Sequence, residues 1–386
     1  MVDEVLKVKD LTVRFYTYAG VVKALEGVNF EVREGETFAI VGETGCGKSV
    51  TALSTMLLTP SPGEIVDGEV LFKRDRGYTD LTKLDEDQMR EIRGNEISMI
   101  FQEPSDALNP VYDVGEQISE SFLSHRKDEL VKDKISEVEG DIDQSEDGGG
   151  RWLNTKLSLY KSMLNEDSNL SNVASKVPLL NSYEGEIEDY ARKKTKEILE
   201  DVGIPDPEGV ADKYPHEMSG GMNQRAVISM ALACKPKLLI ADEPTSNLDV
   251  SIQKRILNIL KNLKDEYNLS ILYITHNLGL VAQTCDRVGV MYAGRIVESA
   301  PVKELFENPE HPYTKLLLKA LPGSEKDELK SVEGSVPDLI SPPSGCRFHP
   351  RCPVASEKCE KRAPDMVEVG EDHKVACHIG EDNNEK

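Results

Sequence analysis

The sequence predicts an α/β fold in which a parallel β-sheet forms the core. Three short apolar runs carry this prediction, each followed by a segment with helical spacing: residues 36–42, 237–243 and 270–276. Short runs that are apolar throughout are typical of parallel strands covered on both faces. Aliphatic side chains must form most of the core, because aromatic residues make up only 5% of the chain.

Three further segments complete the predicted organisation. Residues from about 5 to 33 alternate apolar and polar side chains, which predicts antiparallel strands. Residues from about 103 to 230 have the spacing of helices joined by loops. From about residue 301 the chain becomes rich in proline and contains four of its seven cysteines. We therefore predict a large domain over residues 1–300, with a helical subdomain at about 103–230, and a C-terminal extension over 301–386.

An acidic segment interrupts the helical region at about residues 127–189. A polar, glycine-rich stretch within it, residues 141–151, predicts a mobile loop, and residues 153–164 have helical spacing. We interpret the segment as a solvated loop insertion. The alternative is a contact with a partner protein.

The formal net charge of the chain is −23 at pH 7. A surface this acidic repels phosphate backbones and anionic lipid head groups, which argues against a nucleic-acid partner. The first residues lack the basic and apolar regions of a secretion signal. No apolar run approaches the roughly 20 residues of a membrane helix. We therefore expect a cytoplasmic protein that associates with a membrane only through a partner.

Residues 42–49, GETGCGKS, follow the first predicted parallel strand and precede a helical segment. In such a glycine-rich loop, backbone N–H groups and the helix N-terminus close around phosphates. Lys48 is expected to reach the β- and γ-phosphates, and the Ser49 hydroxyl to bind Mg²⁺. The candidate nucleotide-binding residues are Gly42, Glu43, Thr44, Gly45, Cys46, Gly47, Lys48, Ser49 and Val50.

The second predicted parallel strand ends in two carboxylates, Asp242 and Glu243. Ligands of open α/β sheets bind at this end of the strands. We expect Asp242 to hold Mg²⁺ and Glu243 to orient or deprotonate a water that attacks the γ-phosphate. Two acids at a strand end are common on surfaces, but together with the preceding loop they predict ATP hydrolysis.

Further motifs, in the same order, resemble those of ABC-type ATPases. MSGGMNQR at 218–225 resembles their signature sequence, SNLD at 246–249 resembles their D-loop, and Gln102 and His276 resemble their Q-loop glutamine and switch histidine. The resemblance implies an ABC cassette of the P-loop NTPase fold, with a parallel-sheet core, an N-terminal antiparallel β subdomain and a helical subdomain. It implies catalytic roles for Glu243, His276, Lys48 and Gln102, with Gln102 also contacting Mg²⁺.

The resemblance also implies how ATP is enclosed. Phe15 or Tyr16 stands where the family stacks an aromatic ring on adenine. A head-to-tail dimer of two cassettes closes the signature segment of one subunit on the ATP of the other. The residues implied in that contact are Ser219, Gly220, Gly221 and Asp249.

Three longer segments resemble the ATP-binding subunits of oligopeptide, dipeptide and nickel importers: residues 101–118, 311–322 and 342–353. The MSGGM form at 218–222 and the MIFQEP segment at 99–104 resemble their D-type subunit in particular. This resemblance implies ATP-driven peptide import at the cytoplasmic face of a membrane. The implied partners are a second ATPase subunit in a heterodimer, two transmembrane permease subunits and an extracellular solute-binding protein. A nickel or sugar importer of the same family, and a soluble ABC ATPase outside transport, remain alternatives.

Four cysteines in the extension are separated by five, six and seventeen residues: Cys346, Cys352, Cys359 and Cys377. In a reducing cytosol such a group favours a metal centre over disulfides. Spacing alone leaves zinc and an iron–sulfur cluster as about equal alternatives. Because a [4Fe-4S] cluster occupies the matching cysteines of the importers, the resemblance implies that cluster here, with zinc as the alternative.

Overall fold

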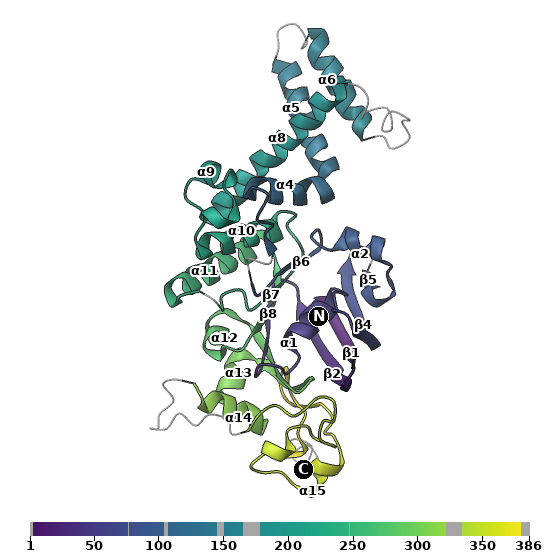
Figure 1. The fold of residues 1–386 in the computed structure, drawn as a ribbon, viewed down its shortest axis with the longest axis vertical. Coiled ribbons are helices and arrows are strands. Elements are labelled where there is room, and N and C mark those ends of the chain that lie inside the picture. The colour runs from purple at the N-terminus through teal and green to yellow at the C-terminus, as the bar shows by residue number, and fades with distance from the viewer. Residues whose placement is uncertain are drawn as a thin grey trace.

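Two β-sheets and a helical region make up the fold of the computed structural model (Figure 1). The structure describes residues 3–75, 77–103, 107–144, 150–164, 178–246, 248–321 and 334–379. Within these residues, no helix is both long and apolar enough to cross a membrane.

The larger sheet has eight strands in the order β11-β12-β10-β9-β3-β8-β7-β6. The run β9-β3-β8-β7-β6 is parallel, and β10, β12 and β11 extend the sheet with antiparallel pairings. The three apolar runs of the sequence form β3, β7 and β8, every residue of which is buried. The strands are β3 (Thr37–Val41), β6 (Ile97–Ile100), β7 (Leu238–Asp242), β8 (Ser270–Thr275), β9 (Arg287–Tyr292), β10 (Arg295–Pro301), β11 (Val367–Gly370) and β12 (His373–Val375).

The smaller sheet is antiparallel and has the order β2-β1-β4-β5. Its first two strands form the hairpin that the alternating pattern of residues 5–33 predicts, with apolar side chains directed into a shared core. The strands are β1 (Glu4–Thr17), β2 (Gly20–Arg33), β4 (Gly63–Arg74) and β5 (Gly77–Asp80). Figure 1 shows this sheet beside the core sheet, with the first helix between them.

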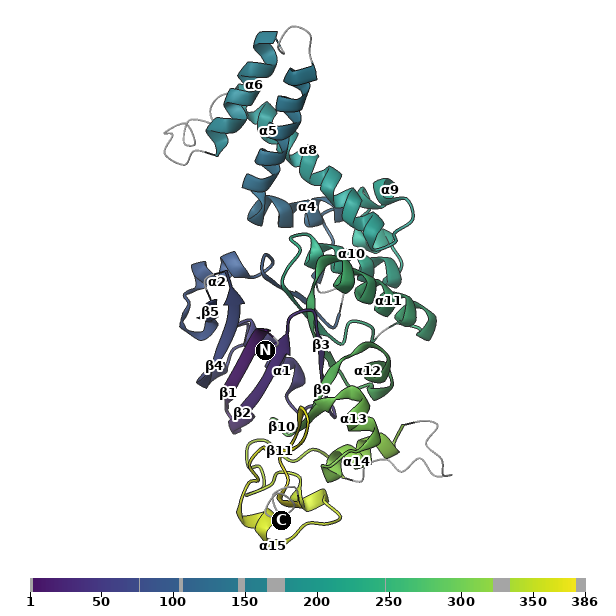
Figure 2. The ribbon, with the colours of Figure 1, turned by 180° about the vertical axis from the view of Figure 1, so that it is seen from behind.

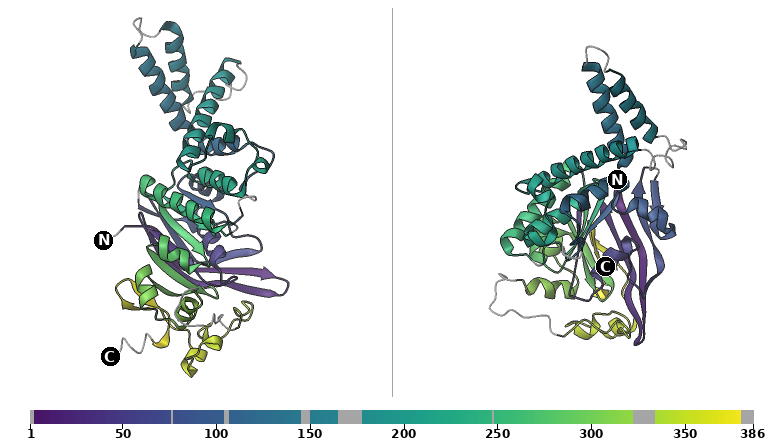
Figure 3. Two further views of the ribbon diagram at one scale, coloured as in Figure 1. Left: turned by 90° about the vertical axis from the view of Figure 1, so that its left-hand side faces the viewer. Right: turned by 45° about the horizontal axis from the view of Figure 1, so that its top comes forward.

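Helices surround the core sheet and extend away from it (Figure 3). The α-helices are α1 (Lys48–Thr55), α2 (Glu86–Ile92), α4 (Val114–His125), α5 (Lys127–Gln144), α6 (Gly150–Met163), α8 (Pro178–Asp201), α9 (Pro207–Ala211), α10 (Gly220–Leu232), α11 (Val250–Tyr267), α12 (Leu278–Thr284), α13 (Val302–Glu307), α14 (Pro312–Lys319) and α15 (Glu357–Lys361). Short 3₁₀ turns are η1 (Leu81–Lys83), η2 (Pro215–Glu217) and η3 (His349–Arg351).

The acidic segment is helical in its described part, where the sequence analysis expected a loop. Helices α5 and α6 project from the body of the molecule (Figures 1 and 3). Apolar side chains of α5, among them Leu130 and Val138, are buried and belong to the same core cluster as the fully buried Tyr160 of α6. A mobile loop was expected at 141–151. Residues 141–144 belong instead to the end of α5 and residues 150–151 to the start of α6, and residues 145–149 lie outside the described part.

The C-terminal region adds strands to the core sheet. Strand β12 pairs with β10 through Glu298 and Val375, and β11 pairs with β12. The fully buried Glu298 carboxylate accepts the backbone N–H groups of Glu310 and His311 and lies 2.8 Å from Nε2 of His373. Figure 2 shows the C-terminal region packed beneath β10. The boundary predicted at residue 300 therefore falls within β10, a strand that both sides share.

Candidate functional site

The glycine-rich loop connects β3 to α1, and its glycines stand where other residues would not fit. A Cβ atom on Gly42 would lie 2.2 Å from the carbonyl oxygen of Met291. Gly47 caps α1 with a φ of 108°, in the left-handed region that favours glycine. These positions keep the loop tight against β9 and leave the N-terminus of α1 at its centre.

Two loop side chains lie near the end of β7, a strand that β8 separates from β3 in the sheet. Lys48 is buried, and its Nζ donates to the carbonyl oxygens of Gly42 at 2.9 Å and Glu43 at 3.1 Å. The Ser49 hydroxyl donates to Oδ1 of Asp242 at 3.2 Å. Burial, and secondarily the charge of Glu243, raise the pKa of Asp242, while Ser49 and Lys48 oppose the rise. A cation held between Ser49 and Asp242 would remove the cost of burying that carboxylate.

Glu243 and His276 meet where β7 and β8 end. Nδ1 of His276 lies 2.9 Å from Oε1 of Glu243. The backbone N–H of Glu243 donates to Ile274, and its φ of 44° is in the left-handed region, which costs a non-glycine residue energy. The Glu243 side chain is mostly buried and that of His276 is 57% exposed. In this arrangement the buried carboxylate can accept a hydrogen bond from a water molecule. The exposed imidazole can contact a phosphate bound next to that water.

The remaining residues predicted on this chain's own site lie in both sheets' surroundings: Gln102 after a strand of the core sheet, and Phe15 and Tyr16 in the smaller sheet. Gln102 is exposed and follows β6, which pairs with β7 through Ile100 and Ala241. Phe15 packs into the core of the smaller sheet against Gly63, whereas Tyr16 is 49% exposed. The structure thus separates the two aromatic candidates, and only Tyr16 has a ring largely open to solvent.

The signature segment begins helix α10 in the helical region. Ser219 is the N-cap residue and is exposed, and its side chain makes no capping hydrogen bond. Gly221 lies against α11, because a Cβ atom on it would be 3.2 Å from Ile252. Asp249 caps α11 by accepting from the N–H groups of Ser251 and Ile252, and the hydrogen bond from the Ser251 hydroxyl lowers the pKa of Asp249. The structure therefore brings the signature segment and the D-loop aspartate to neighbouring helix ends.

Comparison with known proteins decides the family. A family model described as "ABC transporter" matches residues 25–246, and one described as "Oligopeptide/dipeptide transporter, C-terminal region" matches residues 297–359. The chain is 43% identical to the probable peptide ABC transporter ATP-binding protein y4tR of Sinorhizobium fredii, over 97% of this chain and 95% of that protein. The chain belongs to the ABC transporter family. It is an ATP-binding and ATP-hydrolysing subunit of such a transporter.

Other relatives support the same assignment of this ABC ATPase. The dipeptide transport ATP-binding protein DppD of Bacillus subtilis is 42% identical over 98% of this chain and 95% of that protein. A post-hydrolysis dimer of the ATP-binding cassette MJ0796 shares the fold, with a TM-score of 0.53 at 22% identity over 77% of this chain and 98% of that chain. For cbiO1 from Clostridium perfringens the TM-score is 0.51 at 27% identity, covering 79% and 92%.

The C-terminal region of the ABC ATPase contacts the glycine-rich loop, which sequence reasoning missed. The Tyr313 hydroxyl accepts the backbone N–H of Glu43 at 3.0 Å. The guanidinium of Arg351 forms two hydrogen bonds to the Glu43 carboxylate, at 2.8 and 3.0 Å. Neither residue stands in a recognisable nucleotide-binding motif, so only the fold reveals the contacts.

The four cysteines of the C-terminal region lie near one another but do not form a ligand cage. The N–H of Cys346 donates to the carbonyl oxygen of Cys359 at 2.8 Å. Burial raises the pKa of Cys346 to about 11, and the thiols of Cys359, Cys377 and Cys352 add to the rise. Without a cation, this thiol stays protonated near neutral pH. Among the described residues, no three His, Cys, Asp or Glu side chains are arranged to hold a metal ion.

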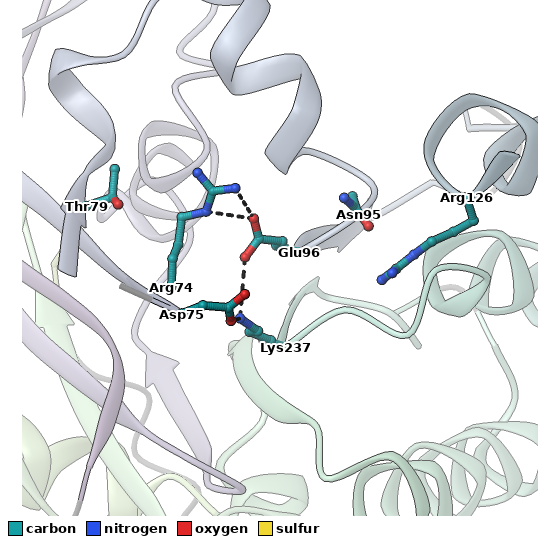
Figure 4. A pocket seen from close by; sticks show the side chains of 7 residues that line it. All are labelled: Arg74, Asp75, Thr79, Asn95, Glu96, Arg126 and Lys237. Atoms are coloured by element: carbon teal, nitrogen blue, oxygen red, sulfur yellow. Dashed lines mark hydrogen bonds and ion pairs between the residues drawn. The ribbon is translucent and has the colours of Figure 1, made fainter. Parts of the chain in front are cut away.

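A depression of about 540 Å³ lies at the other end of the parallel strands (Figure 4). Glu96 and Lys237, which directly precede β6 and β7, line it. Arg74 pairs with Glu96 at 2.6 Å, and Lys237 pairs with Asp75 at 2.9 Å. Because these residues lie at the strand ends opposite Asp242, the depression is separate from the nucleotide site.

Proposed function

We propose that the chain binds MgATP at the glycine-rich loop and uses its hydrolysis to drive peptide import. One observation carries the proposal: the Ser49–Asp242 and Glu243–His276 contacts, at 3.2 and 2.9 Å, stand side by side where β7 and β8 end. Hydrolysis needs a metal site and a water-activating carboxylate at neighbouring positions. These two contacts provide the residues for both.

Each residue near the loop then has a role. Ser49, Asp242 and Gln102 hold Mg²⁺, Glu243 activates the attacking water, and His276 contacts the γ-phosphate. Lys48 leaves its two backbone acceptors for the β- and γ-phosphates when the nucleotide enters. The backbone of residues 42–50 encloses the phosphates. Of the two aromatic candidates, we assign adenine stacking to Tyr16, because the Phe15 ring packs against Gly63.

A second cassette completes the site. Ser219, Gly220 and Gly221 present a helix N-terminus that suits the γ-phosphate bound by a partner cassette. Asp249 lies at the adjacent start of α11, where it would line the same contact. We propose that the partner is a second, different ATPase subunit and that this chain is the D-type subunit of the pair.

Peptides are the proposed cargo, because the relatives are named as peptide and dipeptide transport proteins. Two permease subunits and an extracellular solute-binding protein complete the proposed importer, with this chain at the cytoplasmic face of the membrane. The match of residues 297–359 to the C-terminal region of oligopeptide and dipeptide transporters supports the peptide branch.

We also propose a [4Fe-4S] cluster on Cys346, Cys352, Cys359 and Cys377. An all-thiol donor set suits iron–sulfur chemistry. The described arrangement does not itself form a metal cage, so binding would have to draw the thiols together. ATP hydrolysis uses no electron transfer, so the cluster would serve the fold of the C-terminal region. Anaerobic preparations should contain about four irons per chain, and colourless protein with stoichiometric zinc would refute the cluster.

The import function is tested with the complete complex in proteoliposomes. Labelled di- and oligopeptides should accumulate only with ATP and the solute-binding protein, and Glu243→Gln should abolish accumulation. Uptake of nickel or a sugar, with none of peptide, would contradict the peptide assignment and leave the ATPase assignment standing. ATP hydrolysis with no transport of any solute would favour a soluble ABC ATPase.

A further inference from the structure

We propose that Arg351 and Tyr313 are positioning residues of the nucleotide site: Arg351 neutralises the Glu43 carboxylate and turns it away from the phosphates, and Tyr313 holds the Glu43 backbone in the form of the loop that accepts a nucleoside polyphosphate. The inference rests on the proposed nucleotide binding and extends it to the C-terminal region. The two residues lie 308 and 270 positions from Glu43 along the chain.

The Arg351–Glu43 contact fixes the orientation of both side chains. The guanidinium forms one hydrogen bond to each carboxylate oxygen, a geometry more specific than a single charge contact. The side chain of Arg351 is only 8% exposed and that of Glu43 is 24% exposed, so water and salt screen the pair weakly. Arg351 also donates to the Tyr292 hydroxyl at 3.2 Å and lies 5.6 Å from the centre of that ring.

Tyr313 holds the backbone of the same loop residue. Its hydroxyl accepts the Glu43 N–H, while the Glu43 carbonyl oxygen accepts from Lys48. Tyr313 is fully buried, with ring centres 4.7 Å from Tyr292 and 5.3 Å from Phe348. Three aromatic rings, from β9, from α14 and from the residue before η3, therefore set the position of the hydroxyl. The loop is held at both its main chain and its side chain.

The charge of Glu43 explains why the contact matters for binding. Glu43 is the second residue of a loop that receives several phosphate charges, and an unpaired carboxylate there would repel them. Arg351 neutralises this carboxylate and turns it toward the C-terminal region. Without Arg351, the loop would present a negative charge to the nucleotide, and binding would weaken by about tenfold, the order of one uncompensated charge at short range.

The test measures MgADP binding to the full-length chain by titration calorimetry, with thermal unfolding as a check of the fold. Arg351→Ala should weaken binding about tenfold. Adding Glu43→Gln to that variant removes the unpaired charge and should restore most of the lost affinity. Tyr313→Phe keeps the ring packing, removes only the acceptor, and should weaken binding by a few-fold without restoration by Glu43→Gln.

Two arginines of the same region serve as matched controls. Arg347 donates to the Ala293 carbonyl and to Glu26 but makes no contact with the glycine-rich loop among the hydrogen bonds of the described residues. Any loss of binding in Arg347→Ala should therefore persist when Glu43→Gln is added. Arg362 is exposed and pairs with Asp365, so Arg362→Ala should bind like the wild type.

The outcomes separate this inference from the proposed function. A wild-type chain that does not bind MgADP would overturn both. Wild-type affinity in Arg351→Ala, or a loss that Glu43→Gln fails to restore, would overturn the role of Arg351 alone. If Arg351→Ala does not fold, Glu43→Gln decides: binding at least as tight as the wild type supports the role, and a marked loss in a folded protein contradicts it.

Discussion

Nδ1 of His276 lies 2.9 Å from Oε1 of Glu243, although 33 positions separate the two residues along the chain. The contact follows from the sheet, because β7 and β8 are adjacent and parallel and both residues follow directly where these strands end. The backbone of Glu243 is in the left-handed region, and the hydrogen bond from its N–H to the carbonyl oxygen of Ile274 holds it in that conformation. Strain of this kind persists where the surroundings fix a functional side chain.

Glu243→Gln should stop ATP turnover and spare nucleotide binding. The amide keeps the shape of the side chain and can still bond to His276, but it cannot accept a proton from water. We expect the turnover number to fall by about 100-fold or more, with ATP affinity unchanged. Steady-state hydrolysis is measured with the partner ATPase carrying its own inactivating substitution. The exposed Glu266→Gln on α11 is the control, and near-normal turnover in Glu243→Gln would refute the role.

Alanine substitutions at Phe15 and Tyr16 should have different effects. Tyr16→Ala should weaken MgADP binding by about 1–3 kcal/mol, the range for stacking of a base on an aromatic ring, and leave the unfolding temperature unchanged. Phe15→Ala should lower the free energy of unfolding by up to about 3 kcal/mol, because this ring packs in the core. Tyr18 is fully exposed at the same hairpin, so Tyr18→Ala should alter neither quantity. Reversal of the two effects would reassign the adenine contact to Phe15.

The sequence indicates a candidate nucleotide site because its residues occur in short motifs with fixed spacing. The loop at 42–49, Asp242 and His276 each lie at the carboxyl end of a buried apolar strand, and adjacent parallel strands bring these ends together. Arg351 and Tyr313 could not be found in this way, since folding alone brings them to Glu43.

Two features of the fold were missed for similar reasons. The buried residues of α5, such as Leu130 and Ile135, stand in a sequence that is mostly charged, so the acidic composition concealed their helical spacing. The short strands β11 and β12 pair with β10, which lies far away along the chain. Pairing partners at such distances leave no local pattern in the sequence.

Glycine-to-alanine substitutions at two positions should change stability in opposite directions. Gly140→Ala in α5 meets no atom within 4 Å and should raise the free energy of unfolding by about 0.5–1 kcal/mol, because alanine loses less backbone entropy in a helix. Gly42→Ala would place a Cβ 2.2 Å from the Met291 carbonyl oxygen and should lower both stability and MgADP affinity. Denaturant unfolding and calorimetry measure these effects, and a neutral Gly42→Ala would contradict the tight loop.

The buried pair of Glu298 and His373 should make the attachment of the C-terminal strands depend on pH. The hydrogen bond to Glu298 raises the pKa of His373 above its usual value, although burial opposes the rise. For Glu298, burial raises the pKa, but the bonds from His373 and from two backbone N–H groups outweigh it, so the net shift is downward. The charged pair is therefore favoured in the folded state.

The direction of the pH effect follows from these shifts. The stabilisation from His373 is complete below its unfolded pKa of about 6.5 and is lost as pH rises through the higher folded value. The stabilisation from Glu298 is present above its unfolded pKa of about 4.3 and is lost as pH falls through the folded value.

Breaking a buried pair costs about 3–5 kcal/mol. His373→Gln should therefore lower the free energy of unfolding by about this amount near pH 6 and by clearly less near pH 9. Denaturant unfolding of both proteins at the two pH values measures the difference, with Lys374→Gln as an exposed neighbouring control. An equal cost of His373→Gln at both values would show that the imidazole does not carry a proton in the folded protein.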